Sequence, residues 1–446
     1  MRLPQKKKAS LFVFIMFGIS VLLMAVVFLY FKLVPNDSST IHNDKIILTL
    51  NGPWKFNGGD NPQWAQPEFN DSDWKTADFT APPGSRDDDV GISGYVPGWT
   101  SKGYPNLSGY AWYRIKVPLD SMEGKNLALL APSAVDDAYQ IYVDGVLLVS
   151  SANFSGARPI VYSIKPSMFS LPQRIKNGNI ITVAFRVWMS PSRLGSLDAG
   201  GIHVAPAIGE KKDIEAPYQF QWHQTIKGYI VEVVIPLIFI LLAFTLFILR
   251  QKKILTHHCR WFIVGLILLA LVRTNQAVYF WFDFESAHQF SIVTGVLIIP
   301  FIPGSWVLAW WEWYGLRKPK WLPIIIALLT ANYFVCQLLK QSWLFPSLNN
   351  APFQTIIDYT RPVFILLMLF IIFQAIVRQQ LKDWLTILAT LVISIGIFPK
   401  EVSDLHIIPG IWFPYGVGVS RGQYAYAIFA LVMYIILIQK TRKISS

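Results

Sequence analysis

The apolar run Tyr229–Arg250 restricts the possible folds of this chain more than any other stretch. It holds about twenty almost uninterrupted apolar residues, enough for a helix to cross the ~30 Å hydrocarbon core of a bilayer. The run ends in a basic group formed by Arg250, Lys252 and Lys253. We therefore expect a transmembrane helix here, with a water-soluble part before it and further membrane segments after it.

The composition agrees with several membrane spans. The 446 residues are 53% hydrophobic and their mean hydropathy is +0.40, which is too apolar for an ordinary soluble protein. The net charge of +12 resides outside residues 40–222, a segment in which acidic residues slightly outnumber basic ones. This distribution favours membrane topology over nucleic-acid binding as the reason for the basic excess. The two cysteines, Cys259 and Cys336, lie in or beside predicted spans, so the soluble part needs no disulfide.

The N-terminus predicts an uncleaved membrane anchor. A basic tip, Met1–Ser10, precedes the apolar run Leu11–Phe31, which is longer than a signal-peptide core and lacks a following A-x-A site. A cleaved signal peptide is the alternative. The expected organisation is anchor or signal sequence 1–35, extracytoplasmic β-sandwich 40–204, polar connector 205–227, seven-helix membrane domain 228–440 and cytoplasmic tail 441–446.

The soluble segment has the pattern of an all-β sandwich. Ala111–Val117 and Ile180–Trp188 alternate as strands do, and Ala138–Val149 forms two β-rich runs around Asp144-Gly145, a strong hairpin signal. The turn Asn177–Asn179 precedes the last of these strands. Since no helical pattern interrupts the runs, we do not expect a parallel βαβ sheet.

Several separated motifs of this segment carry a family resemblance. They are Leu50–Phe56, Trp64, Phe69, Asp71–Trp74, Pro83-Gly84, Tyr110–Arg114, Val143–Gly145 and Asn177–Asn179. In this order they resemble the sugar-binding domain of family 2 glycoside hydrolases, a galactose-binding-like jelly roll. Asp144 stands where that family commonly has Asn. The family's catalytic carboxylates lie in a separate barrel domain for which the chain has no room, so we expect no hydrolase activity.

Seven membrane spans are expected after the sandwich. They lie near Tyr229–Arg250, Trp261–Phe282, Phe290–Trp311, Trp321–Leu339, Arg361–Val377, Trp384–Phe398 and Tyr424–Gln439. The sixth is the shortest, and Pro300 and Pro303 are expected to kink the third. Basic loops, including Arg317, Lys318 and Lys382, alternate with acidic ones. This pattern predicts a multi-pass inner-membrane protein with the sandwich extracytoplasmic and the C-terminus cytoplasmic.

This architecture is similar to that of bacterial seven-transmembrane receptors with diverse intracellular signalling modules, whose outer domain is also a carbohydrate-binding-like jelly roll. Those receptors usually end in a kinase, cyclase or phosphatase. This chain ends at TRKISS, so its output would pass to a separate cytoplasmic signalling protein.

Candidate ligand-binding residues of the sandwich are Trp99, Tyr104, Tyr110 and Arg158. Aromatic faces suit the apolar faces of pyranoses, and Trp99 and Tyr104 lie in the Gly-rich loop Gly94–Gly109. Core packing is the alternative, and it is favoured for aromatic residues inside the family motifs. The chain has no nucleotide-binding, protease or kinase motif, and we expect neither a cofactor nor catalytic residues. Neither Asp87–Asp89 nor His257–Cys259 is expected to bind a metal.

Charged residues within predicted spans need partners, because isolated charges are costly in a bilayer. Arg273 lies deep in the second span, and Glu232 on the first is its expected partner. Asn275 and Arg361 are further candidates for a polar pair or pocket. Lys400, Glu401 and Arg421 are expected at the membrane interface, where long side chains extend to water.

The expected function is that of a membrane receptor for an extracytoplasmic ligand, with carbohydrate as the candidate ligand. Two alternatives remain. A transporter would have inverted repeats, which the sequence does not display. A membrane enzyme for surface polysaccharide or lipid would have clustered acids and histidines, of which His406 near Glu401 and Asp404 is the only example.

Overall fold

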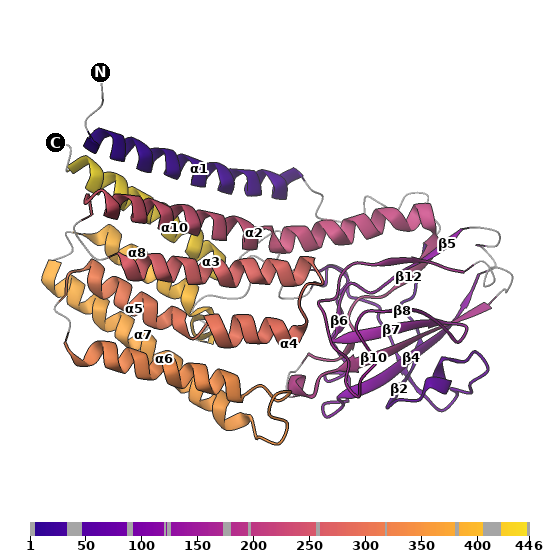
Figure 1. Cartoon of the computed structure of the whole chain (residues 1–446). Coiled ribbons are helices and arrows are strands. Elements are labelled where there is room, and N and C mark those ends of the chain that lie inside the picture. Colours follow the sequence, from indigo (N-terminus) through magenta and orange to yellow (C-terminus); the bar gives the residue numbers. More distant parts are fainter. Residues whose placement is uncertain are drawn as a thin grey trace.

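The computed structural model describes residues 5–33, 47–86, 92–119, 122, 126–172, 180–194, 198–255, 259–316, 319–379, 383–404 and 421–443. Several predicted features lie outside these residues: Asp87–Asp89, the turn Asn177–Asn179, the basic residues Arg317, Lys318 and Lys382, His257 and His258, His406 and the last three residues of the tail. A β-sandwich lies at one end of an elongated molecule, and a helical bundle forms the rest (Figure 1).

The β region consists of two main antiparallel sheets, which confirms the predicted sandwich. Its strands are β1 Ile47–Thr49, β2 Trp54–Gly58, β3 Lys75–Ala77, β4 Gly109–Pro118, β5 Leu127–Leu130, β6 Val135–Asp136, β7 Ala138–Val143, β8 Val146–Ser150, β9 Met168–Ser170, β10 Ile180–Met189, β11 Gly201–Ile202 and β12 Ala207–Glu210. One sheet has the order β1-β12-β5-β9, and the other has the order β3-β2-β4-β10-β7-β8. A small pair, β11-β6, forms a third sheet that lies against β10.

The strands with the strongest sequence pattern form the centre of the larger sheet. Strand β10 pairs with β4 on one side and β7 on the other, with Phe185 opposite Tyr113. The β7–β8 hairpin turns at Asp144 and Gly145, whose φ angles are 47° and 77°. Both residue types tolerate this left-handed region, which a tight hairpin turn requires. The Asp144 carboxylate also accepts a hydrogen bond from the Thr182 amide at 2.8 Å, which ties the hairpin to β10.

Aromatic side chains fill the space between the two sheets. Trp54, Phe56, Tyr113 and Phe185 are all at most 3% exposed. The Trp54 indole donates to the Leu50 carbonyl at 2.8 Å, which satisfies the polar atom of an otherwise apolar side chain. The first family motif, Leu50–Phe56, is therefore part of the core.

A second, smaller aromatic cluster lies on the outer face of the larger sheet. Trp112 packs there against Trp64, which in turn contacts Trp74. The loop that carries these residues is held down by Arg114, whose side chain is 1% exposed. Its Nε donates to Asp71 at 2.8 Å, and its Nη atoms donate to the carbonyls of Trp64 and Gln66. These motif residues thus have structural roles.

The bundle contains several long apolar helices, as a multi-pass membrane protein does. Its elements are α1 Gln5–Leu33, α2 Lys211–Gln251, α3 Arg260–Trp281, α4 Ala287–Phe290, the π-helical η6 Ser291–Ile298, α5 Phe301–Trp313, α6 Trp321–Leu339, α7 Ala351–Gln379, α8 Trp384–Ile397, α9 Pro399–Asp404 and α10 Arg421–Lys443. Within the described residues, seven segments are long and apolar enough to cross a membrane, counting α4 to α5 as one and including α1.

The predicted sixth span corresponds to the short helix α8. Its 14 residues extend about 21 Å, which is less than the ~30 Å core of a bilayer. Six long segments therefore follow the sandwich among the described residues, where seven spans were expected. Helix α8 packs closely along α10, so it belongs to the bundle despite its length.

The expected polar connector is largely helical. Residues 205–227 contain strand β12 and the first turns of α2, which continues as one helix of 41 residues, about 60 Å long. Ile214 and Tyr218, one helical turn apart, pack on Ala128, Leu130 and Ala207 of the smaller sheet. The polar residues around them hid this apolar face, which is why the sequence indicated only a polar connector.

The third predicted span is interrupted near its prolines. The π-helical segment η6 ends at Ile298, Ile299 and Pro300 form a turn, and α5 begins at Phe301. Pro300 has no amide hydrogen and clashes with the preceding helical turn, so an interruption is expected at this position. Gly304 follows in the first turn of α5, where an added Cβ would lie 2.8 Å from Thr330 of α6. The interruption thus coincides with close packing between two helices.

Candidate functional site

A groove of about 740 Å³ opens at one side of the sandwich. One wall is the edge strand β3 with the residues that follow it, and the other is the turn from Trp99 to Tyr104. The floor is aromatic, since Phe56, Phe79 and Tyr113 reach it from the core. The volume lies within the range of about 300–1,000 Å³ that is usual for small-molecule sites.

Two of the predicted ligand-binding residues line this groove. Trp99 is only 2% exposed, its indole donates to the Leu107 carbonyl at 3.0 Å, and its ring lies against Gly200. A Cβ at Gly200 would clash with that ring, so the packing requires a glycine there. Tyr104 is half-buried and packs edge-on against Phe56 at 5.0 Å. Tyr104 is therefore the more accessible of these two aromatic side chains.

The other two predicted residues lie elsewhere. Tyr110 lies on the outer face of the larger sheet, beneath the Arg186 guanidinium, which is 4.2 Å from the ring centroid. Arg186 is itself paired with Asp60 and hydrogen-bonded to Gln140 at 2.9 Å. Arg158 is exposed. Neither Tyr110 nor Arg158 contributes to the groove.

The groove also has charged residues that the sequence did not single out. The Lys75 ammonium lies 5.2 Å from the Tyr104 ring centroid, and the Lys102 ammonium lies 5.6 Å from that of Phe79. Lys102 Nζ donates to the Asp78 backbone carbonyl at 3.2 Å. Burial lowers the pKa of Lys102, although the nearby charges of Asp78 and Asp198 oppose that effect. Hydrogen bonds from Thr80 lower the pKa of the Asp78 carboxyl.

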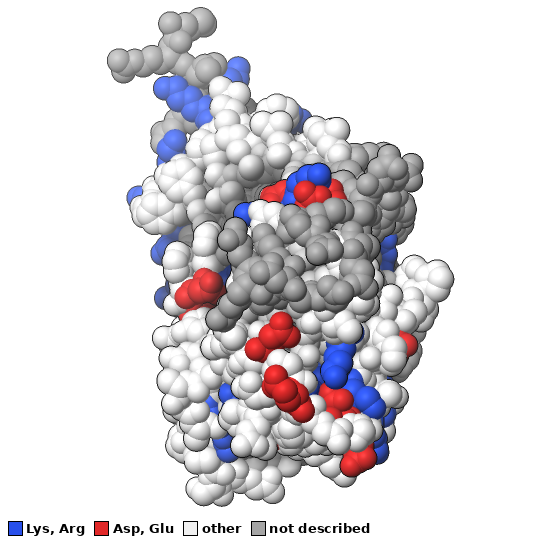
Figure 2. All heavy atoms as spheres, turned by 90° about the vertical axis from the view of Figure 1, so that its right-hand side faces the viewer, with Lys and Arg blue, Asp and Glu red and all other residues white. Residues whose placement is uncertain are grey.

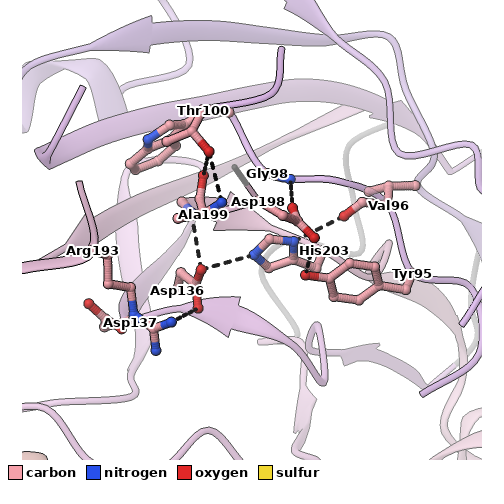
Figure 3. Close-up of polar contacts among 12 residues, drawn as sticks. Tyr95, Val96, Gly98, Thr100, Asp136, Asp137, Arg193, Asp198, Ala199 and His203 are labelled. Carbon is pink, nitrogen blue, oxygen red and sulfur yellow. Dashed lines mark hydrogen bonds and ion pairs between the residues drawn. The ribbon is translucent and has the colours of Figure 1, made fainter. Parts of the chain in front are cut away.

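A polar cluster fixes the back of the groove wall to the segment from Asp198 to His203 (Figure 3). Asp198 accepts hydrogen bonds from the Tyr95 hydroxyl at 3.0 Å and from the Gly98 amide at 2.6 Å. The Thr100 hydroxyl donates to the Ala199 carbonyl and accepts from the Ala199 amide, at 3.0 and 2.8 Å. The loop that carries Trp99 and Lys102 is thereby held from behind.

His203 lies at the centre of this cluster and is buried. Its Nδ1 is 3.0 Å from the Val96 carbonyl, its Nε2 is 3.3 Å from an Asp136 oxygen, and its ring stacks on Tyr95. Both ring nitrogens therefore lie close to protein oxygen atoms, one from the backbone and one from a carboxylate. The pKa of the Asp136 carboxyl is lowered: burial raises it, but the His203 hydrogen bond and the charge of Arg193 outweigh that effect.

The cluster continues toward the bundle through Arg193. Its guanidinium pairs with Asp137 and lies 3.4 Å from Asp136, and it is within electrostatic reach of Tyr279 at the end of α3. Further contacts join the two parts of the molecule. Lys165 pairs with Asp283, the Ala287 amide donates to the Val161 carbonyl at 2.8 Å, and Gln224 of α2 donates to Ser93 at 3.2 Å.

Inside the bundle, the structure brings Glu232 and Arg273 together. Arg273 Nη1 lies 3.2 and 3.4 Å from the two oxygens of Glu232, whose side chain is 2% exposed. Gln423 of α10 also donates to Glu232. The other Arg273 Nη approaches the Tyr426 hydroxyl at 3.5 Å, and that hydroxyl donates to the Gly396 carbonyl of α8 at 2.6 Å. The network thus connects α2, α3, α8 and α10.

Asn275 and Arg361 belong to other contacts, so the four candidate residues do not form a single pocket. Asn275 donates to Thr294 of η6 at 3.0 Å and to Glu285 at 3.4 Å. Arg361 of α7 pairs with Glu401, one of whose oxygens lies 2.9 Å from Nη2, and donates to the Tyr333 hydroxyl at 3.0 Å. Each cation has partners from neighbouring helices, which offset its cost in an apolar environment.

No family model matches the sequence, and no curated protein matches it. About a third of the chain is similar in structure to family 2 glycoside hydrolases. The Bacteroides uniformis β-glucuronidase shares 18% identity over 37% of this chain and 18% of its own, with a TM-score of 0.27. A glycosyl hydrolase family 2 member from Bacteroides cellulosilyticus shares 17% over 36% of this chain and 20% of its own, with a TM-score of 0.27. The Ruminococcus gnavus β-glucuronidase shares 13% identity over 38% of this chain and 29% of its own, with a TM-score of 0.25. The chain thus spans less than a third of the length of these proteins.

Proposed function

We propose that this protein is a membrane receptor that binds a saccharide in the groove of its sandwich and relays binding to the membrane bundle. The observation that carries the proposal is the continuity of α2. Its first turns pack on the smaller sheet through Ile214 and Tyr218, and the same helix contributes Glu232 to the polar network of the bundle. A displacement of the sheet would be transmitted to the bundle along this continuous helix.

The chain of contacts behind the groove supports the proposal. The groove loop bonds to Asp198 and Ala199, and the segment that contains His203 bonds to Asp136 (Figure 3). Arg193, which pairs with Asp136 and Asp137, lies within electrostatic reach of Tyr279 at the end of α3. Each of these polar interactions can be gained or lost. A ligand that differentially stabilises one arrangement of the groove wall would shift the populations of such contacts.

The proposed orientation places the sandwich outside the inner membrane and both termini in the cytoplasm. Helix α1 begins and helix α10 ends at the end of the bundle opposite the sandwich (Figure 1). Basic residues favour the cytoplasmic side of a membrane. Several lie at or next to the termini of the described helices at this end of the bundle, namely Arg250, Arg260, Lys320, Arg378, Lys440 and Arg442. The face of the sandwich turned away from the bundle has charges of both signs among uncharged residues (Figure 2). The proposed output is a contact with a separate cytoplasmic signalling protein.

Saccharide binding is tested by titration calorimetry on the full chain in lipid nanodiscs with a panel of mono- and oligosaccharides. Tyr104→Ala removes an accessible groove wall and is expected to weaken binding at least tenfold. Tyr110→Ala is the matched control, because Tyr110 lies on another face of the sandwich and should leave the affinity unchanged. Absence of saccharide binding, or equal losses in both variants, would contradict a saccharide site in the groove.

The relay is tested by hydrogen exchange on the same nanodiscs. Ligand should change the protection of amides in α2 and at the end of α3, as well as in the loop Gly94–Gly109. A change in protection confined to the groove loop would mean that the protein binds the ligand but does not relay binding through the bundle.

A further inference from the structure

The chemistry of the groove narrows the class of saccharide that it would take. Three charged residues line it: Lys75, Lys102 and Asp78. The Asp78 carboxylate accepts a hydrogen bond from the Thr80 amide, and its backbone carbonyl is the acceptor for Lys102. The groove therefore has two ammonium groups and one carboxylate that is already engaged by the backbone.

The two lysines differ from the paired cations of the sandwich. Arg114, Lys165, Arg186 and Arg193 each form an ion pair with an aspartate. Among the residues that the structure describes, no ion pair joins Lys75 or Lys102 to a carboxylate. Both ammonium groups instead lie above aromatic rings that line the groove.

This geometry offers complementary contacts to one kind of ligand. A pyranose ring would stack on Tyr104, which is half-buried and accessible from the groove. A carboxylate on that ring would meet Lys75 or Lys102 and form a charge-assisted hydrogen bond, which is stronger than one between neutral groups.

We infer that the groove selects acidic saccharides, in which a carboxylate on a pyranose ring bonds to Lys75 and Lys102 while the ring stacks on Tyr104. This inference rests on the proposed saccharide site and specifies its ligand class. Sulfated sugars are also anionic but carry a sulfate in place of the carboxylate, so the experiment below compares the two kinds of sugar.

The test uses the full chain in nanodiscs of zwitterionic lipid, so that the bilayer contributes no competing anion. The probes are digalacturonate, the neutral digalactoside of the same linkage and a sulfated digalactoside. We expect digalacturonate to bind at least tenfold more tightly than the neutral probe. Tighter binding of the sulfated probe than of digalacturonate would mean that the groove recognises a sulfate and not a carboxylate, and it would overturn the inference.

The variants are Lys75→Gln, Lys102→Gln and the double substitution, with Lys116→Gln as a control. Lys116 is exposed on β4 and does not line the groove. The double variant should bind digalacturonate and the neutral probe with affinities within threefold of each other, and Lys116→Gln should behave as the wild type. Raising the salt from low to high concentration should weaken acidic-probe binding in the wild type and not in the double variant. Lys75→Arg with Lys102→Arg should retain the preference, because the charges remain.

The outcomes separate this inference from the receptor proposal. Equal binding of neutral and acidic probes, insensitive to the lysines but lost in Tyr104→Ala, would overturn acid selectivity and leave a neutral saccharide site. Binding of none of the probes, in a chain whose thermal melt is intact, would overturn both. Lysine-dependent acid binding without any change in helix protection would support the inference and contradict the relay.

Discussion

Glu232 on α2 and Arg273 on α3 face each other inside the bundle, with 3.2 Å between Oε1 and Nη1. An arginine left without its carboxylate in an apolar environment costs several kcal/mol, and breaking a buried pair is worse than removing both partners. Arg273→Leu or Glu232→Leu alone should therefore lower the amount of folded protein in the membrane. The double substitution should recover part of that loss, as measured by fluorescence-detected size-exclusion chromatography.

Gln423 and Tyr426 also contact the pair, so recovery in the double variant should be incomplete. Leu237 is a suitable control position, because its side chain is exposed on the same helix and Leu237→Ala removes no polar contact. A double variant no more abundant than either single variant would mean that Glu232 and Arg273 contribute independently.

Gly396 permits the close approach of α8 and α10. A Cβ on Gly396 would lie 2.5 Å from the Tyr426 ring, whose hydroxyl donates to the Gly396 carbonyl. Gly396→Ala should therefore destabilise the bundle by about 1–3 kcal/mol, the usual cost of overpacking. In α1, no atom lies within 4 Å of a Cβ added at Gly18, so Gly18→Ala should not lower the melting temperature of the purified protein. Equal melting temperatures for the two variants would contradict this packing.

Arg114 holds the loop from Trp64 to Phe69 on the larger sheet. Arg114→Met retains much of the apolar side chain but leaves Asp71 and two backbone carbonyls without their donor. Breaking such a buried pair costs about 3–5 kcal/mol. The sandwich should melt at a markedly lower temperature, whereas Lys116→Met at an exposed position of the same strand should change stability by at most about 0.5 kcal/mol.

The position of Asp136 predicts a dependence of stability on pH. Its pKa in the folded protein is lowered, so near this pKa the unfolded chain binds more protons and stability rises with pH. The contribution is complete above the unfolded pKa of about 3.9 and is lost as the pH falls through the lower folded value. Asp136→Asn should therefore be less stable at pH 7 and lose less stability between pH 5 and 3, as followed by thermal melts. A parallel loss in wild type and variant over that range would contradict the assignment.

The features predicted well from the sequence are those with local causes. The Asp144-Gly145 hairpin follows from the backbone preferences of two adjacent residues, and strands β4 and β10 follow from alternation. Glu232 is the expected partner of Arg273 because the first two spans run in opposite directions, which places both residues at a similar depth in the bundle. Asn275, in contrast, was grouped with Arg273 by proximity in sequence. Residues two apart on a helix point to different sides, and Asn275 contacts Thr294 instead.

The features that the sequence missed depend on contacts between distant segments. Trp99 lies in a Gly-rich loop, but Gly200, about a hundred residues later, covers its ring. His203 and Asp136 have no local motif, since β11 and β6 bring them together only in the folded sandwich. Lys75 and Lys102 likewise become neighbours of one groove through tertiary structure alone. Sequence patterns carry no information about such juxtapositions.

The final prediction concerns the direction of the helices across the membrane. If the sandwich is outside and both ends of the chain are in the cytoplasm, reporter fusions should read cytoplasmic at Lys320 and after Ser446, and extracytoplasmic at Asp358. Lys320 precedes α6 at the end away from the sandwich, and Asp358 lies near the start of α7 at the opposite end (Figure 1). Ser446 lies outside the described residues. The decisive position is Ser446, because α8 has only 14 residues. A cytoplasmic reading there requires that α8, together with its neighbouring segments, crosses the membrane before α10 returns. An extracytoplasmic reading at Ser446 combined with an extracytoplasmic reading at Asp358 would contradict that crossing and make α8 a helix buried within one half of the bundle.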